Sequence, residues 1–281
     1  MKFSRTLAAV ALTATAPLTA CSPVDVFGPH PDGDLLTLAR QAEADAGTLD
    51  GDAAGMREFH ARQLFDEITR LCGTDTAGLP PSSCEVERGP GEATGAKDDV
   101  AAAVALTDAL VTQSGKLPDE SVPLVVAQAV DLTASLDAPG SDDWDFPVPE
   151  EPIADESVAE TAAELIKEEH AVQFGLDLAS AYADDNLQAR IDNLRPLHDM
   201  RIDAMRDAFP DLPPRAPGYE VDGGGPTNPG EAAAFVDNIE ATLVDRWRTA
   251  ASDAFTEDAP AECRTLVIHL AAHAQRAANT A

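Results

Sequence analysis

The chain has 281 residues, with 19 Lys+Arg against 50 Asp+Glu and a formal net charge of -31 at pH 7. Because so few cations are available to neutralise phosphates, this balance argues against nucleic-acid binding. Apolar residues make up 44% of the sequence, which excludes a wholly disordered acidic chain and is enough to build a core.

The N-terminus has the pattern of a signal peptide over residues 1–20. Lys2 and Arg5 precede an uncharged, mostly apolar run over residues 7–18, which is shorter than the roughly 20 residues that a membrane-spanning helix needs. Leu-Thr-Ala-Cys then follows and resembles the bacterial lipobox, whose cysteine becomes the lipid-modified N-terminus. We expect acyl chains such as palmitate on Cys21 and an anchor on the extracytoplasmic face of the cell membrane. The alternative is an ordinary secretory signal with a coincidental cysteine.

The stretch after Cys21 is expected to be a stalk, and a helical domain is expected to follow it. Residues 21–32 contain three prolines and no helical period. Beyond them the apolar spacing is helical, without sustained alternation. Four helices are predicted in an N-terminal domain over residues 33–137, at 34–46, 52–71, 98–114 and 121–136. Asp52 and Ser121 are plausible N-caps, and Gly73 stands where a C-cap belongs.

Three cysteines follow Cys21, and an exported protein lives where disulfides persist. Cys72 ends the second predicted helix, and Cys84 follows a turn-rich loop. This spacing favours a Cys72–Cys84 disulfide, although pairings with Cys263 stay open. No CxxC pair is present, which argues against a structural zinc site.

Residues 138–152 are predicted to be an acidic, proline-rich linker between two helical bodies, because four prolines interrupt the helical period there. In the C-terminal domain, residues 153–281, we predict four helices. The first begins at Asp155, and the others cover 185–209, 230–255 and 260–278. A Pro/Gly-rich crossover over 210–229 separates the second helix from the third. The predicted fold class is therefore all-α, with a ferritin-like four-helix bundle as the C-terminal body.

Short motifs in this half also point to a family. They are Glu169-His170-Ala171, the segment 198–205, the crossover around Tyr219, the segment 241–251 with Trp247, and the segment 275–278. Together they make residues 154–281 resemble the ferritin-like DUF4439 family of actinobacterial proteins, a domain of unknown function. The resemblance implies a ferritin-like fold and no particular activity. The N-terminal half looks like the helical region that precedes this domain in such lipoproteins.

A ferritin-like bundle raises the question of a di-metal centre. Ferritin-like di-iron proteins bring a Glu from each of two helices and a Glu-x-x-His from each of the other two into the core. The candidate ligands for an iron or manganese pair are Glu169, His198, Glu240, His269 and His273. Both Glu-x-x-His motifs are broken, because Arg195 stands three residues before His198 and neither of the last two histidines follows a Glu by three.

The alternative to a metal is a buried hydrogen-bonded pair that specifies packing, and we favour it. Glu169 lies on the apolar stripe of its helix, where a carboxylate needs a partner. His198, Arg195 or Arg201 could each provide that partner without any cofactor. In the N-terminal half, His60 also falls on an apolar stripe and is expected to be a packed core residue.

The sequence contains no GxSxG motif, phosphate-binding loop or dinucleotide fingerprint, and we predict no catalytic residue. The favoured function is a lipid-anchored envelope protein with a degenerate ferritin-like bundle and a non-catalytic binding or structural role. Its partner would be an envelope protein or a cell-wall component, besides the membrane itself. Two alternatives stay open: a ferritin-like metal-binding protein or oxidase, and a solute-binding protein with its ligand between the two helical halves.

Overall fold

The computed structural model describes residues 28–74, 77–113, 115–136, 144–221, 224–257 and 259–280. Across these residues the chain folds into eight α-helices and two short 3-10 helices, without a β-strand. The predicted all-α fold class is therefore confirmed. The predicted signal peptide, Cys21 and most of the predicted stalk lie outside the described ranges. Within those ranges, no helix combines the length and the apolar character that a membrane crossing requires.

The four helices of the N-terminal half begin and end within two residues of their predicted positions. They are α2 (Gly33–Ala46), α3 (Gly51–Cys72), α4 (Asp99–Thr112) and α5 (Val122–Ala134). Two short helices, η1 (Ser82–Cys84) and η2 (Asp119–Ser121), precede α4 and α5 respectively.

The helix caps in this half differ from the prediction in two places. α3 begins one residue earlier than predicted, so Asp50 takes the N-cap position and Asp52 lies in the first turn. Ser121 stands at the N-cap of α5 as predicted, but its hydroxyl donates a hydrogen bond to Glu67 on α3 at 2.5 Å and does not cap its own helix. Gly73 ends α3 as predicted, with a φ of 73° that favours glycine.

The predicted disulfide is present. Cys72 and Cys84 are bonded, with 6.3 Å between their Cα atoms. The bond joins the last residue of α3 to η1 and closes the loop between them. Cys263 is a free, buried thiol in the last helix. Closing the loop stabilises the fold mainly by restricting the unfolded chain.

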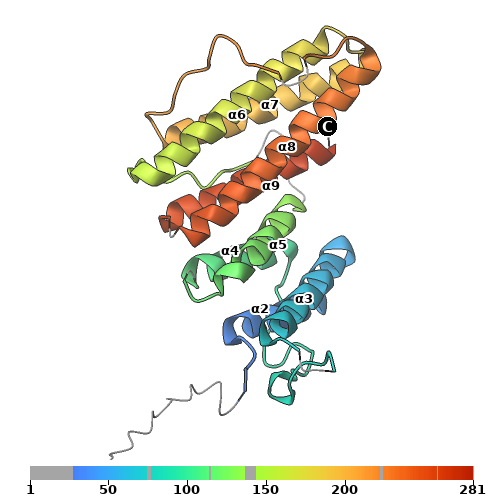
Figure 1. Cartoon of the computed structure of the whole chain (residues 1–281), viewed down its shortest axis with the longest axis vertical. Helices are drawn as coiled ribbons and strands as arrows, with labels where there is room; N and C mark the ends of the chain where they lie inside the picture. Colours follow the sequence, from blue (N-terminus) through green and yellow to red (C-terminus); the bar gives the residue numbers. More distant parts are fainter. Residues whose placement is uncertain are drawn as a thin grey trace, which may run out of the picture.

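The C-terminal half forms a four-helix bundle, drawn in yellow to red in Figure 1. Its helices are α6 (Glu156–Ser180), α7 (Asp185–Ala208), α8 (Pro229–Thr256) and α9 (Ala261–Thr280). Within the bundle, each helix contacts two of the other three helices, in the ring order α6, α7, α9, α8. α7 continues as one helix through Pro196.

The crossover between α7 and α8 runs along the bundle beside α6. It starts where α6 begins, because the Ile153 N–H donates to the Ala208 carbonyl at 2.9 Å. Midway, the ring of Tyr219 lies 5.8 Å from that of Phe174 on α6. Near its end, Gly225 faces a side chain close to the C-terminus of α6. A return path of this length makes helices adjacent in the ring antiparallel, which is the predicted connectivity of two helices, a long crossover and two helices.

α4 and α5 lie between the α2–α3 hairpin and the bundle, as Figure 1 shows. α5 packs on α8 and α9 on one side, and it contacts α3 on the other. The buried apolar side chains form one continuous cluster that runs from Leu35 in α2 to Ala277 in α9. The predicted division into two separate helical bodies is therefore not confirmed.

Part of the predicted linker packs against the bundle. Residues 137–143 lie outside the described ranges, but the next residues are in place against α9. The rings of Trp144 and Phe146 lie 5.2 Å and 5.1 Å from the ring of His273. Aromatic side chains bury a large apolar area, which offsets the proline and carboxylate content of this stretch.

Candidate functional site

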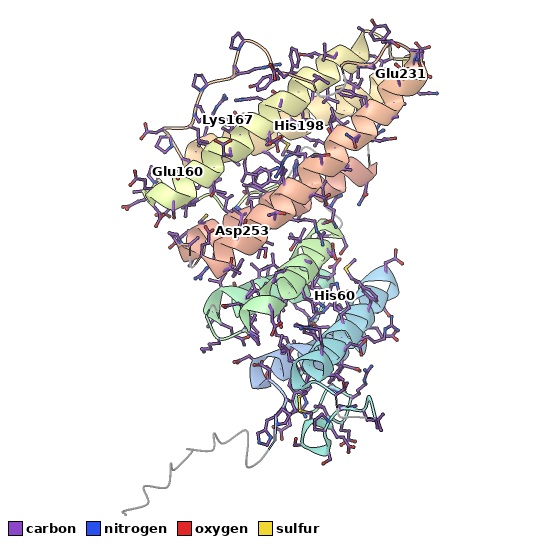
Figure 2. The ribbon with its side chains drawn as sticks, in the orientation of Figure 1. His60, Glu160, Lys167, His198, Glu231 and Asp253 are labelled. Atoms are coloured by element: carbon purple, nitrogen blue, oxygen red, sulfur yellow. A yellow bond between two sulfur atoms is a disulfide. The ribbon has the colours of Figure 1, made fainter. Side chains whose placement is uncertain are left out.

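Five ionisable side chains meet at the centre of the bundle, and an indole N–H joins them. All four bundle helices contribute, and every side chain is almost completely buried; Figure 2 labels His198 among them. We call this group the Arg201 cluster: Glu169 from α6, His198 and Arg201 from α7, Glu240 and Trp247 from α8, and His273 from α9. Burying a charged group away from water costs free energy unless the group is paired. The contacts within the cluster therefore determine the protonation of each side chain.

Glu169 accepts four hydrogen bonds, two at each carboxylate oxygen. Its Oε1 accepts from Arg201 Nε at 2.6 Å and from Trp247 Nε1 at 2.7 Å. Its Oε2 accepts from His198 Nδ1 at 2.6 Å and from Arg201 Nη2 at 3.2 Å. Burial alone would raise the pKa of Glu169, but the Arg201 and His198 charges and their hydrogen bonds outweigh it and lower the pKa to about 2. The carboxylate is thus ionised, and its roughly four lone-pair sites are all used.

His198 lies between two carboxylates. Its Nδ1 faces Glu169, and its Nε2 is 3.0 Å from Glu240 Oε1. Burial and the Arg201 charge would lower the pKa of His198, but the Glu169 charge and the hydrogen bonds to both carboxylates outweigh them and raise it. A protonated ring can donate from both nitrogens, which is what two flanking carboxylates require. Arg201 Nη2, 2.7 Å from Nδ1, then shares the Glu169 acceptor and does not bond to the ring.

His273 is the neutral histidine of the cluster. Its Nδ1 lies 3.1 Å from Arg201 Nη1, so an unprotonated Nδ1 accepts a hydrogen bond from the guanidinium. Burial and the Arg201 charge lower the pKa of His273 to about 3, against the opposing effect of Glu169. The cluster therefore holds two cations, Arg201 and His198, against two carboxylates. These charges balance, and no net charge is buried.

The arrangement brings four of the five candidate metal ligands together and leaves the fifth outside. His269 lies one turn before His273 on α9, only half-buried, with its ring 6.5 Å from Trp144. The four that meet do not fit a di-metal centre, because Arg201 brings a permanent positive charge between them and Glu169 has no lone pair left. Among the residues that the structure describes, no group of three or more His, Cys, Asp or Glu side chains is arranged to hold a metal ion.

The sequence-based prediction names some of the hydrogen-bond partners of Glu169 and misses one. Of the three candidate partners of Glu169, His198 and Arg201 both bind it, whereas Arg195 pairs with Asp177 and Asp192 at the surface. The Trp247 N–H was not anticipated as a donor. Its position seven residues after Glu240 on α8 is the available signal, because residues seven apart lie on the same face of a helix.

A second buried arginine lies in the α2–α3 hairpin, and Figure 2 labels its neighbour His60. Arg57 binds Asp45 Oδ2 through Nε at 3.0 Å and Nη2 at 2.9 Å. Asp45 Oδ1 accepts from Gln41 Nε2 at 2.8 Å and from the Ala96 backbone N–H at 2.9 Å. His60 Nδ1 lies 3.3 Å from Arg57 Nη1. We call these residues the Arg57 cluster.

His60 is neutral, which confirms the expectation of a packed core histidine. It is 1% exposed. Burial and the Arg57 charge lower the pKa of His60 to about 4, against a weaker opposing effect of Asp131. Its Nδ1 is therefore free to accept a hydrogen bond from Arg57. One cation faces one carboxylate in this cluster, so its charges also balance.

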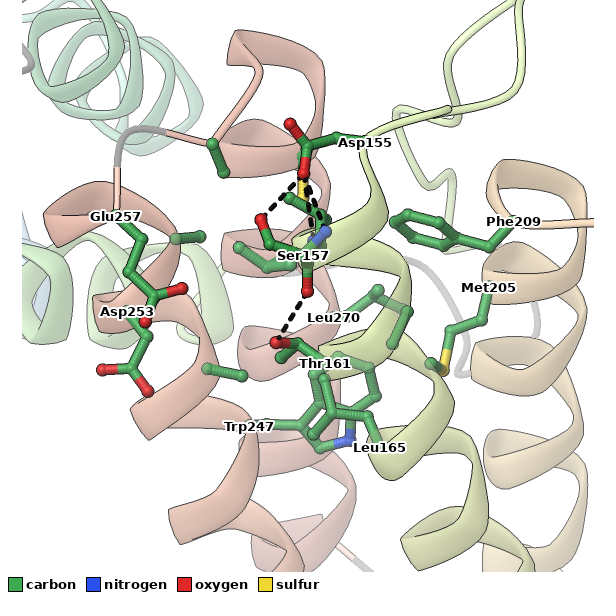
Figure 3. A pocket seen from close by; sticks show the side chains of 17 residues that line it. Asp155, Ser157, Thr161, Leu165, Met205, Phe209, Trp247, Asp253, Glu257 and Leu270 are labelled. Carbon is green, nitrogen blue, oxygen red and sulfur yellow. Dashed lines mark hydrogen bonds between the residues drawn. The ribbon is translucent and has the colours of Figure 1, made fainter. Parts of the chain in front are cut away.

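A pocket opens at the end of the bundle where α6 begins and α8 ends (Figure 3). The pocket is narrow: counted with the open solvent at its mouth it holds about 600 Å³, but the space that a water-sized molecule can reach is about 50 Å³. The wall is buried and mostly apolar, and its largest side chains are Leu165, Met205, Phe209, Trp247, Cys263, Val267 and Leu270. The mouth is exposed and polar, with Asp155, Ser157, Thr161, Asp253 and Glu257.

The pocket contacts the Arg201 cluster through Trp247. The indole ring lines the pocket, while its N–H donates to Glu169 on the inner side. Cys263 lies in the wall, but burial, reinforced by the Asp155 charge, raises the pKa of its thiol to about 12. Because the thiolate is the nucleophilic form, this cysteine is unreactive at neutral pH. The pocket is thus suited to binding and presents no activated nucleophile among its described side chains.

A more open groove lies between α5 and α8, where the two halves meet. Its side chains include Val126, Val130 and Arg248. The Arg248 guanidinium is already engaged, because it donates to Asp131 on α5 at 2.7 Å and to Gln275 on α9. This groove is the place where the two halves pack together, and it is wider and more open than the pocket at the bundle end.

Comparison of the chain with protein-family models, with curated proteins and with solved structures finds no match.

Proposed function

We propose that this protein is a non-catalytic binding protein that takes up a small, largely apolar ligand in the pocket at the end of its bundle. The observation that supports this is the contrast between the two buried regions of the bundle. In the Arg201 cluster every charge has a partner, and Glu169 has no free lone pair. The pocket, by comparison, offers apolar wall area and a polar mouth with access from solvent.

The pocket supports this function better than the groove between the halves. Apolar surface removed from water contributes about 25 cal/mol per Å². The wall side chains are already buried, so this gain comes from the apolar surface of the ligand itself, and it is greater in the less open of the two sites. The wall of the pocket provides apolar side chains from all four bundle helices. The groove is open, and its arginine is held by Asp131.

We further propose that acyl chains on Cys21 hold the protein at the extracytoplasmic face of the membrane. The support is the sequence pattern that ends in Leu-Thr-Ala-Cys. Cys21→Ser should release the protein from the membrane fraction, and mass spectrometry of the wild-type N-terminus should show the added acyl mass. An unmodified N-terminus on membrane-bound protein would contradict the anchor and leave the ligand pocket untouched.

Ligand binding is tested with Trp247, which lines the pocket. The chain has two tryptophans, so Trp144→Phe makes Trp247 the remaining fluorophore. In the Cys21→Ser, Trp144→Phe chain, the neutral probe n-octanol should change the Trp247 emission saturably. Ala254→Phe, which fills the half-buried side of the pocket, should abolish the response while the circular dichroism spectrum is retained. Calorimetry with the same probe detects binding that leaves the Trp247 emission unchanged. Absence of binding in both measurements would refute the proposed function.

A further inference from the structure

The mouth of the pocket is acidic, and its carboxylates differ in how they are engaged. Asp155 caps α6, because its Oδ1 accepts hydrogen bonds from the Ser157 and Val158 backbone N–H groups and from the Ser157 hydroxyl. These hydrogen bonds lower the pKa of Asp155. Its charge is therefore used at the N-terminus of its own helix, where an anion stabilises the helix dipole.

Asp253 and Glu257 have no such role. Asp253 lies in the last turn of α8 and Glu257, four residues later, is the C-cap residue that follows the helix; both are exposed and lie at the pocket mouth, as Figure 3 shows. Within the described part of the chain, neither carboxylate has a hydrogen bond or an ion pair. Like charges at this spacing repel each other at the end of a helix. They also lie at the C-terminal end of α8, where the helix dipole already disfavours negative charge.

The described cations near these carboxylates lie outside the pocket: Asp253 also lines the groove between α5 and α8, whose Arg248 is bound to Asp131. None of the described residues that line the pocket is Lys, Arg or His. Arg264, the residue after Cys263, lies over the ring of Phe255 at 5.5 Å and is not part of the lining. An apolar ligand that carried a positive charge at its outer end would therefore meet the two carboxylates at the mouth, while its apolar part lay against Trp247 and Leu270.

We propose that the pocket selects amphiphilic cations: small molecules with a slender apolar body and an amine or quaternary ammonium head. This inference rests on the proposed function, and it adds the charge of the ligand. The apolar wall provides most of the binding, and the Asp253–Glu257 pair provides the preference for a cation over a neutral or anionic head group. A neutral ligand of the same shape binds in the same pocket without the second contribution.

The test compares three probes of equal chain length, n-octylamine, n-octanol and octanoate, in the Cys21→Ser, Trp144→Phe chain at pH 7 and low salt. We expect octylamine to bind about threefold more tightly than octanol, because exposed ion pairs contribute little, and octanoate to bind most weakly. Exposed charges are screened by salt, so the advantage of the amine should shrink at high ionic strength. Asp253→Asn with Glu257→Gln should reduce octylamine to the affinity of octanol and leave octanol unchanged.

A matched pair of carboxylates provides the control. Glu156 and Glu160 are also exposed, also four residues apart and at the same end of the bundle, but they do not line the pocket. Glu156→Gln with Glu160→Gln removes the same charge and should leave the preference for the amine intact. If this control variant loses the preference as well, the effect comes from the overall negative charge and the inference about the mouth is wrong.

The remaining outcomes separate the two proposals. Equal binding of octylamine and octanol in the parent chain overturns the inference about the head group and leaves the proposed function standing. Binding of none of the three probes overturns both. Tight binding of octanoate, with weak binding of the amine, also contradicts the inference and assigns the pocket to anionic amphiphiles.

Discussion

The Arg201 cluster and the Arg57 cluster both combine an arginine, a histidine and a carboxylate, yet their histidines carry different charges. Each arginine lies three residues from its histidine on one helix, and each binds a buried carboxylate from the preceding helix. His198 also faces Glu240, and its pKa is raised. Among the described residues no carboxylate hydrogen-bonds to the His60 ring, Asp131 acts on it only weakly, and its pKa is lowered to about 4. The comparison teaches that the count of carboxylates at a buried site sets the protonation of its histidine, because the enclosed charges must balance.

Removing either buried arginine should cause the largest loss of stability, and the loss should be greater for the Arg201 cluster than for the Arg57 cluster. Breaking a buried ion pair costs about 3–5 kcal/mol, because an uncompensated charge stays buried. Arg201→Met leaves two carboxylates with His198 as their only cation. The loss in free energy of unfolding, measured with urea, should lie at the upper end of this range. Arg57→Met should fall at the lower end, since Asp45 keeps two other hydrogen-bond donors.

Two further variants control that ranking. Arg62→Met removes an exposed ion pair with Glu58 and should cost less than about 1 kcal/mol. Adding Glu169→Gln to Arg201→Met should recover part of the loss, since the pair is coupled. An additive double variant would show that Glu169 and Arg201 do not depend on each other.

The two histidines should give opposite dependences of stability on pH. His60 has a folded pKa below its unfolded value of about 6.5, so the unfolded state binds its proton more readily. Stability should therefore fall as the pH drops from about 6.5 to about 4, by about 3 kcal/mol from this residue. His60→Gln should reduce the slope of stability against pH in this range by the equivalent of one bound proton. The raised pKa of His198 adds stability below pH 6.5 that is lost as the pH rises through its folded pKa.

Ring-nitrogen NMR checks the same comparison directly. At pH 7 the His198 ring should give the signals of an imidazolium, and the His60 ring those of a neutral imidazole. A neutral His198 at this pH would contradict the charge balance that we derive for the bundle core.

Loss of the disulfide should affect the Arg57 cluster and spare the other one. Cys72→Ser with Cys84→Ser releases the loop after α3 and should cost roughly 2–3 kcal/mol. This loop leads toward Ala96, whose N–H donates to Asp45. Hydrogen exchange should therefore accelerate at Ala96, while the indole N–H of Trp247 keeps its protection. Equal acceleration at both positions would show that the two clusters open together.

Within the two clusters, the smallest effects should come from the neutral donors. Trp247→Phe removes one hydrogen bond to the enclosed Glu169 and should cost about 2 kcal/mol, because hydrogen bonds to buried charges are the strong ones. Gln41→Ala removes the corresponding donor to Asp45 near the surface and should cost about 1 kcal/mol. Thermal or urea unfolding would detect the difference, and a larger loss for Gln41 would reverse the comparison.

The positions of the helices are predictable from the sequence, whereas the central cation is harder to foresee. Apolar residues at alternating spacings of four and three mark one face of each helix, such as the face through His198 and Ile202 on α7. Arg201 precedes Ile202 and lies at the edge of that face. A helix surrounded by neighbours buries a wider arc than one stripe, so the residue beside the stripe is buried too.

Other differences come from packing between distant segments. Trp144 and Phe146 lie in a stretch whose prolines and carboxylates indicate a linker, and no local pattern reveals that α9 will cover them. The approach of α5 to α8 and α9 depends likewise on Asp131, Arg248 and Gln275 meeting across more than a hundred residues of chain. Periodicity describes the faces of a helix and does not say which partner each face will find.

The placement of α5 has a consequence for how this chain can be shortened. Its Val125, Ala129 and Val130 are completely buried, with α8 and α9 packed against the helix. A fragment that starts at α6 would expose to water the sides of α8 and α9 that α5 covers, and we expect it to aggregate where the intact chain stays dispersed.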